Sequence, residues 1–424
     1  MTVGERSSTL ALLRRLPAVL RLLVLTQFAF NVGFYLVVPF IAAHLSETLA
    51  LAGWVIGLVL GLRTFSQQGL FILGGTLADR FGIKRAILTG VAIRIVGFVI
   101  TGMAREVWSV MLGVVLIGFA AALFSPAVES ALTAWAGELE VAGGPPRGEV
   151  IGLELMASKL GTIVGPLLGG VLLVVPFEVT CLVAAGVFGC ILLAHICLLP
   201  DGARVGTVSR VGESLGQVLG NRRFLTFALI HSTYLVGYNQ LYLALPVELQ
   251  RIGAPSATIT WLFALAAVLV IWGQLPVTRV VAHWSVAKVL GWGYALMAAG
   301  FAGVALLSVL PPMVGWFSLL PAVWFVVGLH LGQMLVLPAA RATVAELAGG
   351  QRLGSHLGML ASIGGAAVLV TSTAIGVVLP WAATPSHLAF VPWLLLAALP
   401  ALSAAGAVTF SRRHLSTDPM KGHP

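Results

Sequence analysis

The sequence predicts an all-α integral membrane protein, with 12 transmembrane helices arranged in two six-helix bundles. Three observations predict this fold class. Hydrophobic residues make up 59% of the 424 residues and charged residues only 9%, whereas soluble chains carry ~25% charge. The mean hydropathy is +1.02. Apolar runs that are long enough to cross a bilayer, which takes ~20 residues, follow one another with short polar connections.

The first bundle, residues 1–199, is predicted to contain six helices, over residues 18–43, 49–78, 86–104, 107–136, 150–175 and 177–199. A short acidic connection at Glu47 separates the first two helices, and residues 137–148 form a polar loop. Residues 200–223 are the longest polar connection in the chain. We interpret them as a cytoplasmic linker between the bundles.

The second bundle, residues 224–410, is predicted to contain helices over residues 224–250, 257–283, 287–310, 313–347, 353–379 and 387–410. A basic cytoplasmic tail, residues 411–424, follows. Weak repeats relate the bundles, because Pro39 precedes Trp54 by 15 residues and Pro246 precedes Trp261 by the same 15. Parallel repeats of this kind enclose a midplane cavity that can open to either side of the membrane.

Lysine and arginine residues in the loops predict the orientation, because positively charged loops stay cytoplasmic. With the N-terminus inside, nearly all of these residues are cytoplasmic, and only Arg105 and Arg251 lie outside. Both termini are therefore expected in the cytoplasm. The formal charge of +9 is scattered among short loops, so no nucleic-acid partner is expected. The first apolar run is too long for a cleavable signal peptide.

Residues 74–85 interrupt two apolar runs with glycines and charged residues. We predict a membrane-edge hairpin just inside the cytoplasm, in which Gly82 supplies a turn with positive φ. The segment resembles the hallmark of the major facilitator superfamily, G-x-L-A-D-R-x-G-[RK]-[RK], although Ile83 replaces one basic position. The resemblance implies a major facilitator fold and a cytoplasmic gate formed by Gly75, Asp79, Arg80, Gly82 and Lys84.

A second signature lies in the predicted fifth helix, where glycines four residues apart form one small face and a proline permits a kink. It resembles the G-x-x-x-G-P-x-x-G-G pattern of exporting, proton-antiporting members of the superfamily. The matching residues are Gly161, Gly165, Pro166, Gly169 and Gly170. A plain packing motif is the alternative. The equivalent stretch of the eleventh helix has Leu369 and Val370 in place of Gly-Pro.

Most of the chain resembles bacterial multidrug exporters of the MdtH type, in the drug:proton antiporter group. The likeness includes Gly61-Leu62-Arg63, Gln67-Gln68-Gly69, the helix of Arg94 and residues 253–257. It implies a multi-pass protein of the bacterial inner membrane, which we expect to be a monomer. Family exporters often carry an arginine in the fourth helix where this chain has Val114, which places their usual coupling route in doubt.

Polar residues within the predicted helices are the candidates for substrate binding, because a charge at the bilayer centre costs ~2.5–3.5 kcal/mol. They describe a cavity with a cationic wall from the first bundle and an aromatic wall from the second. The candidates are Asn31, Tyr35, Arg63, Gln67, His231, Tyr234, Tyr238, Asn239, His330 and Gln333. Core packing of the tyrosines and histidines is the alternative. Arg94 and Lys159 are placed nearer the cytoplasmic gate.

Carboxylates are scarce in the predicted helices, and none occupies the midplane. Glu129 and Glu154 lie toward the cytoplasmic ends of the fourth and fifth helices. Glu129 and Glu154 are therefore candidates for proton coupling, as is His231, because imidazole titrates near neutral pH. A permanent ion pair that braces the closed gate is the alternative role for Glu129.

The function predicted from these patterns is secondary active transport, namely proton-coupled export of amphipathic drugs or metabolites by alternating access. The partners are a small-molecule substrate, protons and the lipid bilayer. One alternative is a symporter or uniporter for an anionic metabolite or lipid, and a membrane receptor is less favoured. The sequence contains no phosphate-binding loop, metal-ligand cluster or nucleophilic triad, so neither an enzyme nor a cofactor is expected.

Overall fold

A computed structural model describes residues 9–71, 82–200, 216, 218–310, 313, 315–349, 353–384 and 386–414. The described residues form helices and connecting turns, with no strand among them. The all-α fold class is therefore confirmed. Ten helices are long and apolar enough to cross a membrane by length and composition, within the part of the chain that is described.

The described residues of the first half form eight α-helices, three of which are extended by short 3-10 or π-helical turns at their ends. In chain order these are α1 (Thr9–Arg15), α2 (Ala18–Val37) with η1 (Val38–Phe40), α3 (Ile41–Glu47), α4 (Gly53–Thr64) with η2 (Phe65–Gly69), α6 (Ile83–Met103), α7 (Val107–Val141), α8 (Arg147–Val171) with η3 (Leu172–Val174) and α9 (Phe177–Leu198). Several begin after a proline, including α2, α8 and α9. Proline suits this position because a first-turn N–H has no helical partner.

The second half contains six α-helices in the described residues. They are α11 (Arg222–Arg251), α12 (Thr258–Val281), α13 (Val286–Ser308), α14 (Leu320–Leu347) preceded by η4 (Gly315–Leu319), α15 (Leu353–Val378) with η5 (Leu379–Ala382), and α16 (Phe390–His414). The Asn221 side chain caps α11 by accepting a hydrogen bond from Phe224 N at 3.1 Å. Ser285 caps α13 in the same way through Lys288 N.

Each of the twelve predicted spans contains a helix, and the ends differ in informative ways. The first span breaks into a 3-10 turn at Val38–Phe40, where Pro39 removes a backbone donor. The second span passes into a π-helical turn at Phe65–Gly69. The fourth helix continues to Val141, into the segment predicted as a loop, and the short helix α1 was not predicted at all.

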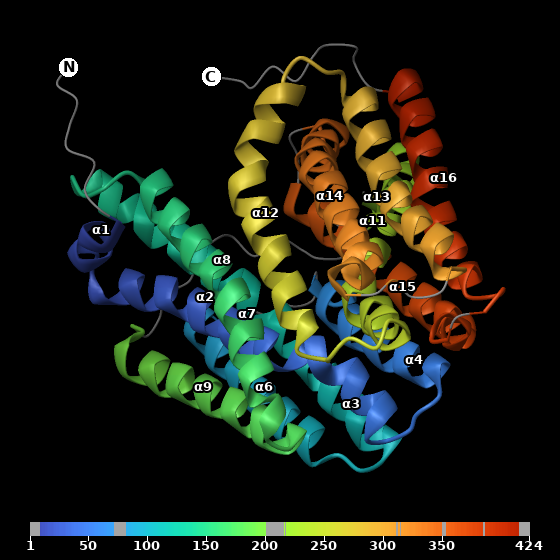
Figure 1. The fold of residues 1–424 in the computed structure, drawn as a ribbon. Helices are drawn as coiled ribbons and strands as arrows, with labels where there is room; N and C mark the ends of the chain where they lie inside the picture. The colour runs from blue at the N-terminus through green and yellow to red at the C-terminus, as the bar shows by residue number, and fades with distance from the viewer. Residues whose placement is uncertain are drawn as a thin grey trace.

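Within each half the helices pack on their neighbours, α6 against α7 and α9, and α13 against α14 and α16. The two halves meet mainly along two pairs, α4 with α15 and α8 with α12, and α11 also contacts α3 and α4. Figure 1 shows α8 and α12 close together at one end and diverging toward the other. At the close end, the C-terminal part of α8 contacts the first turn of α12, where Thr260 Oγ1 donates a hydrogen bond to Pro166 O at 3.1 Å.

Candidate functional site

The predicted gate motif lies mostly beyond what the structure describes, since Gly75, Asp79 and Arg80 fall in residues 72–81. Gly82 and Lys84 are described. Gly82 has φ 89° and ψ 154° and precedes the first turn of α6. This left-handed conformation favours glycine, because a Cβ would clash with the backbone. Gly82 thus provides the positive-φ turn that the sequence predicts, while the gate role of the motif stays a prediction.

A chain of hydrogen bonds joins the halves at the centre of the molecule. Arg63 Nη2 donates to Thr64 Oγ1 at 2.9 Å, and Thr64 Oγ1 donates to Asn239 Oδ1 at 2.9 Å. Asn239 Nδ2 then donates to Ser372 Oγ at 3.0 Å. These four residues, which we call the central polar network, come from α4, α11 and α15, and all four are buried. The π-helical turn that follows Thr64 is a feature found often at functional sites.

Aromatic rings surround the Arg63 guanidinium. Its carbon lies 5.3 Å from the ring centroids of both Phe34 and Tyr242, within the range of cation–π attraction. Tyr35 and Tyr238 also meet across the halves, with 3.1 Å between their hydroxyl oxygens. Gln67 Oε1 accepts a longer contact of 3.4 Å from Arg63 Nη1. Of the candidates for the two predicted walls, Tyr35, Arg63, Tyr238 and Asn239 therefore meet at the interface of the halves.

Arg94 of α6 lies in an aromatic cage inside the first half. Its guanidinium carbon is 4.0 Å from the ring centroid of Phe30 and 4.9 Å from that of Phe188. The side chain is 1% exposed, and its three nitrogens have no hydrogen-bond partner among the described residues. In the described part of the chain no carboxylate lies within ion-pair distance of Arg63 or Arg94, so two buried cations lack an anionic partner.

The histidines and tyrosines of the second half form a packed layer. The His231 ring stacks on Tyr234 at a centroid distance of 5.2 Å, and His231 Nδ1 lies 2.8 Å from the Tyr294 hydroxyl. Gln333 Nε2 donates to the Tyr234 hydroxyl at 2.6 Å. His330 Nδ1 donates to Val326 O at 2.7 Å within its own helix. Each histidine is satisfied inside the bundle, which favours the packing alternative for both.

The predicted coupling acids lie near each other in the first half, and Glu129 also interacts with the second half. Glu154 is 7% exposed and approaches Gln27, whereas Glu129 of α7 is exposed. Glu129 lies close enough to Arg341 of α14, in the other half, for an electrostatic interaction. Asn31 Nδ2 donates to Ser158 Oγ at 3.1 Å and so fixes α2 against α8 beside these acids. The arrangement leaves Glu129 accessible and Glu154 covered.

The glycines of the predicted antiporter motif have two different neighbours. A Cβ on Gly165 would lie 2.7 Å from Tyr35 Cβ and 2.9 Å from Val32 O, and Gly161 and Gly169 face α2 in the same way. Gly170 instead faces Thr260 of α12 in the other half. The motif therefore lets α8 approach α2 within one half while its end contacts the second half.

A glycine stripe on α4 was missed by the sequence reasoning. Gly53, Gly57 and Gly61 recur every four residues, and Cβ atoms there would meet the α15 backbone or side chains at Gly376, Ser372 and Leu369. This spacing is the small-xxx-small signal of close helix packing, so it could have been found. Thr64 and Ser372 of the central polar network and Tyr294, which contacts His231, were also missed, because their polarity alone does not single them out.

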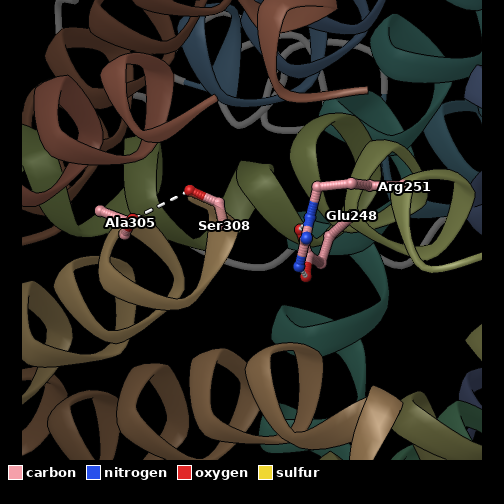
Figure 2. Close-up of polar contacts among 4 residues, drawn as sticks. All are labelled: Glu248, Arg251, Ala305 and Ser308. Atoms are coloured by element: carbon pink, nitrogen blue, oxygen red, sulfur yellow. Dashed lines mark hydrogen bonds and ion pairs between the residues drawn. The ribbon is translucent and has the colours of Figure 1, made fainter. Parts of the chain in front are cut away.

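A buried ion pair closes α11 at its last turn. Arg251 donates through Nε to Glu248 Oε2 at 2.8 Å and through Nη2 to Glu248 Oε1 at 2.6 Å (Figure 2). Both side chains are 1% exposed. Nearby, Ser308 donates to Ala305 O at 2.9 Å within α13 (Figure 2). Arg251, predicted to lie in an outer loop, is thus inside the bundle and paired.

Comparisons with known proteins agree on one family. The model of the Major Facilitator Superfamily matches residues 23–371. An uncharacterized MFS-type transporter, Rv0849 of Mycobacterium tuberculosis, is 36% identical over 368 residues and covers 84% of each chain. The multidrug resistance protein MdtH of Proteus mirabilis is 31% identical over 337 residues, or 79% of this chain and 80% of its own.

Solved structures share the fold at low sequence identity. The nucleoside transporter NupG superposes with a TM-score of 0.74 at 14% identity, over 92% of this chain and 98% of its own. A POT family transporter in complex with 5-aminolevulinic acid gives a TM-score of 0.75 at 13% identity, over 94% and 97% of the two chains. At this identity the likeness concerns the arrangement of the helices.

Proposed function

The chain belongs to the major facilitator superfamily, and we propose that it exports amphipathic small molecules in exchange for protons by alternating access. As a member of this family it is a multi-pass membrane transporter of small molecules and not an enzyme. The main observation that supports export by proton antiport is the position of the Gly161–Gly170 segment. It packs on α2 of its own half and reaches α12 of the other.

Such a position suits a joint about which the halves rock. Glycines at the joint allow backbones to slide with little side-chain interlocking, and Pro166 permits a local kink because it has no backbone N–H to donate. The Pro166 carbonyl oxygen accepts a hydrogen bond from Thr260 of the other half. Relatives named multidrug resistance protein MdtH, 31–33% identical over most of the chain, support export of drug-like compounds. The bundles 1–199 and 224–410, joined by the linker 200–223, are the units that we propose to move.

The contacts between the halves suggest which side is open. Thr260 and Gly170 join at the α8 and α12 ends predicted to face away from the cytoplasm, and Figure 1 shows these helices diverging toward their other ends. We therefore interpret the structure as closed on the outer side and open toward the cytoplasm. In this state an exporter of the bacterial inner membrane loads its substrate.

The residues around Arg63 form the proposed substrate site, and Glu129 with Glu154 the proposed proton site. Arg63, Tyr35 and Tyr238 lie where the two halves meet, so a ligand there would contact both. Two buried arginines without a carboxylate among the described residues also favour a second candidate function, transport of an anionic metabolite or lipid. An anionic group would supply the missing partner of Arg63.

Efflux from living cells tests the proposal. Cells loaded with a fluorescent amphipathic cation should lose it faster when they express the chain, and a protonophore should abolish the difference. Asp79→Asn should remove efflux at unchanged expression, because the family gate needs the carboxylate. The matched control, Arg105→Gln in an outer loop, should retain efflux. Efflux that resists the protonophore, or that survives in Asp79→Asn, would contradict the proposal.

A further inference from the structure

A groove on the lateral surface of the second half lies between α13 and α16. It has a volume of about 840 Å³, and its lining includes Ser285, Lys288, Gly291, Trp292, Ala405 and Arg412. Trp292 is 55% exposed, and Leu306 and Leu402, farther along the same two helices, are 71% and 69% exposed. In a membrane transporter such a surface faces lipid, so the groove opens toward the bilayer rather than toward the transport pathway.

One end of the groove is strongly basic. Lys288 lies in the first turn of α13 and Arg412 in the last turn of α16, and both side chains are exposed. The segments 279–295 and 400–414 contain no aspartate or glutamate that could neutralise them. The Lys288 ammonium lies 4.1 Å from the ring centroid of Trp284, which holds it at the groove mouth.

The remaining part of the groove is apolar. Its walls carry small side chains, including Gly291, Ala295 and Ala405. A Cβ on Gly291 would lie 2.7 Å from Val408 Cγ2, so α13 and α16 pack closely beneath the groove floor. A channel lined by small apolar residues accommodates a hydrocarbon chain, whose burial is favourable. A soluble anion has no apolar chain to bury there and so gains no binding free energy from this part of the groove.

A buried hydroxyl supplies an independent observation. Ser411 lines the groove and is 5% exposed, yet its Oγ has no hydrogen-bond partner among the described residues. Serine within a helix commonly donates to the carbonyl four residues earlier, and here it does not. An unmet buried hydroxyl is costly, by about 1–3 kcal/mol in general, and a ligand oxygen would satisfy it.

We propose that this groove binds an anionic glycerophospholipid, whose phosphate lies against Lys288, Arg412 and Ser411 while one acyl chain lies along Gly291 and Ala405. Basic pockets between transmembrane helices on the cytoplasmic side are suited to anionic headgroups, and tryptophans gather at the same depth. The site is on the opposite surface of the second half from the interface with the first half, and it is independent of which substrate is transported.

Native mass spectrometry of the purified full-length chain tests the site. The protein is titrated with phosphatidylglycerol or with phosphatidylcholine of the same acyl chains, and retained lipid is counted. Wild type should retain phosphatidylglycerol in preference. Lys288→Gln/Arg412→Gln should weaken this retention roughly 10- to 30-fold, since each basic residue near the surface contributes about one factor of five. The control Arg222→Gln/Arg223→Gln removes equal charge from α11 at the same face and should bind as wild type.

Two further measurements distinguish a lipid site from a site for soluble phosphate. Ala405→Leu keeps every charge but fills the apolar channel, and it should also weaken phosphatidylglycerol retention. Glycerol 3-phosphate in excess should fail to displace the lipid. Equal retention of the two lipids by wild type, or unchanged retention in both Ala405→Leu and the double variant, would overturn the proposal. So would displacement by glycerol 3-phosphate, because the groove would then be a soluble phosphate site. A melting curve confirms that each variant is folded.

Discussion

At the residue scale, Arg63 is the centre of the proposed substrate site. Its guanidinium is buried between Phe34 and Tyr242 and has no carboxylate partner in the described part of the chain. Arg63→Gln should weaken anionic or zwitterionic substrates by about 1–3 kcal/mol, the range for charge-assisted hydrogen bonds, and spare purely cationic ones. Binding of matched substrates of each charge, with Arg105→Gln as control, measures this. Equal weakening of both classes would identify a purely structural arginine.

The coupling residue can be identified by comparing gradient-driven and counterflow transport. Glu129→Gln or Glu154→Gln should lose proton-driven uphill accumulation and keep downhill counterflow, because an amide carries no exchangeable acid proton. Glu138→Gln, an exposed acid on the same helix as Glu129, should keep both activities. If uphill accumulation survives in both candidate variants, neither carboxylate carries the proton.

For His231, unlike Glu129 and Glu154, we expect a packing role and no role in proton coupling. Its ring is stacked on Tyr234 and hydrogen-bonded to the buried Tyr294 hydroxyl, so the structure favours packing over coupling. His231→Leu should keep uphill transport but destabilise the folded protein by about 1–3 kcal/mol, because the Tyr294 hydroxyl loses its partner. Thermal unfolding and uphill uptake are the two measurements. Normal stability together with lost coupling would restore His231 as the proton site.

At the element scale, the glycine stripe of α4 controls how closely the halves approach. A methyl group at Gly57 would meet the backbone of Ser372, and overpacking of this kind costs about 1–3 kcal/mol. Gly57→Ala should therefore disfavour the contact of α4 with α15 and slow transport. Gly186→Ala on α9, where nothing lies within 4 Å, is the matched control and should transport normally. Normal transport by Gly57→Ala would show that the contact does not limit the cycle.

Most helix positions could be predicted from the sequence, because apolar length alone places a membrane span. The predictions fail at local irregularities and helix ends, which the length of an apolar run does not determine. Pro39 interrupts the first span, and the π-helical turn after Thr64 depends on packing that hydropathy does not record. The fourth helix was predicted to end at residue 136, but it continues to Val141. Its last residues are polar, so their composition resembles that of a loop.

Some residues of the central contacts could be named from the sequence, but their pairing could not. Arg63, Tyr35, Tyr238 and Asn239 were found because polar groups in a bilayer are expensive. Their contacts were not predictable, because Thr64 is 175 residues from Asn239 in sequence and their hydrogen bond depends on how α4 and α11 cross. Ordinary residues such as Ser372 become part of the network only through that crossing.

At the scale of the whole molecule, rocking of the halves predicts opposite distance changes at the two membrane faces. Spin labels at Glu149 and Arg279 report the divergent ends of α8 and α12, and labels at Val174 and Ala257 report the joined ends. Conversion to the outward-open state should shorten the first distance and lengthen the second. Pulsed electron paramagnetic resonance measures both. Changes of the same sign would exclude rocking about the α8 joint.

In a proton antiporter, substrate export and proton entry are one coupled exchange. Purified chain in proteoliposomes, with a pH-sensitive dye inside, tests this claim directly. Adding a transported amphipathic cation, with no imposed gradient, should drive protons in the direction opposite to the cation, and Asp79→Asn should abolish both fluxes. Substrate movement without proton movement, or movement of both in the same direction, would contradict antiport.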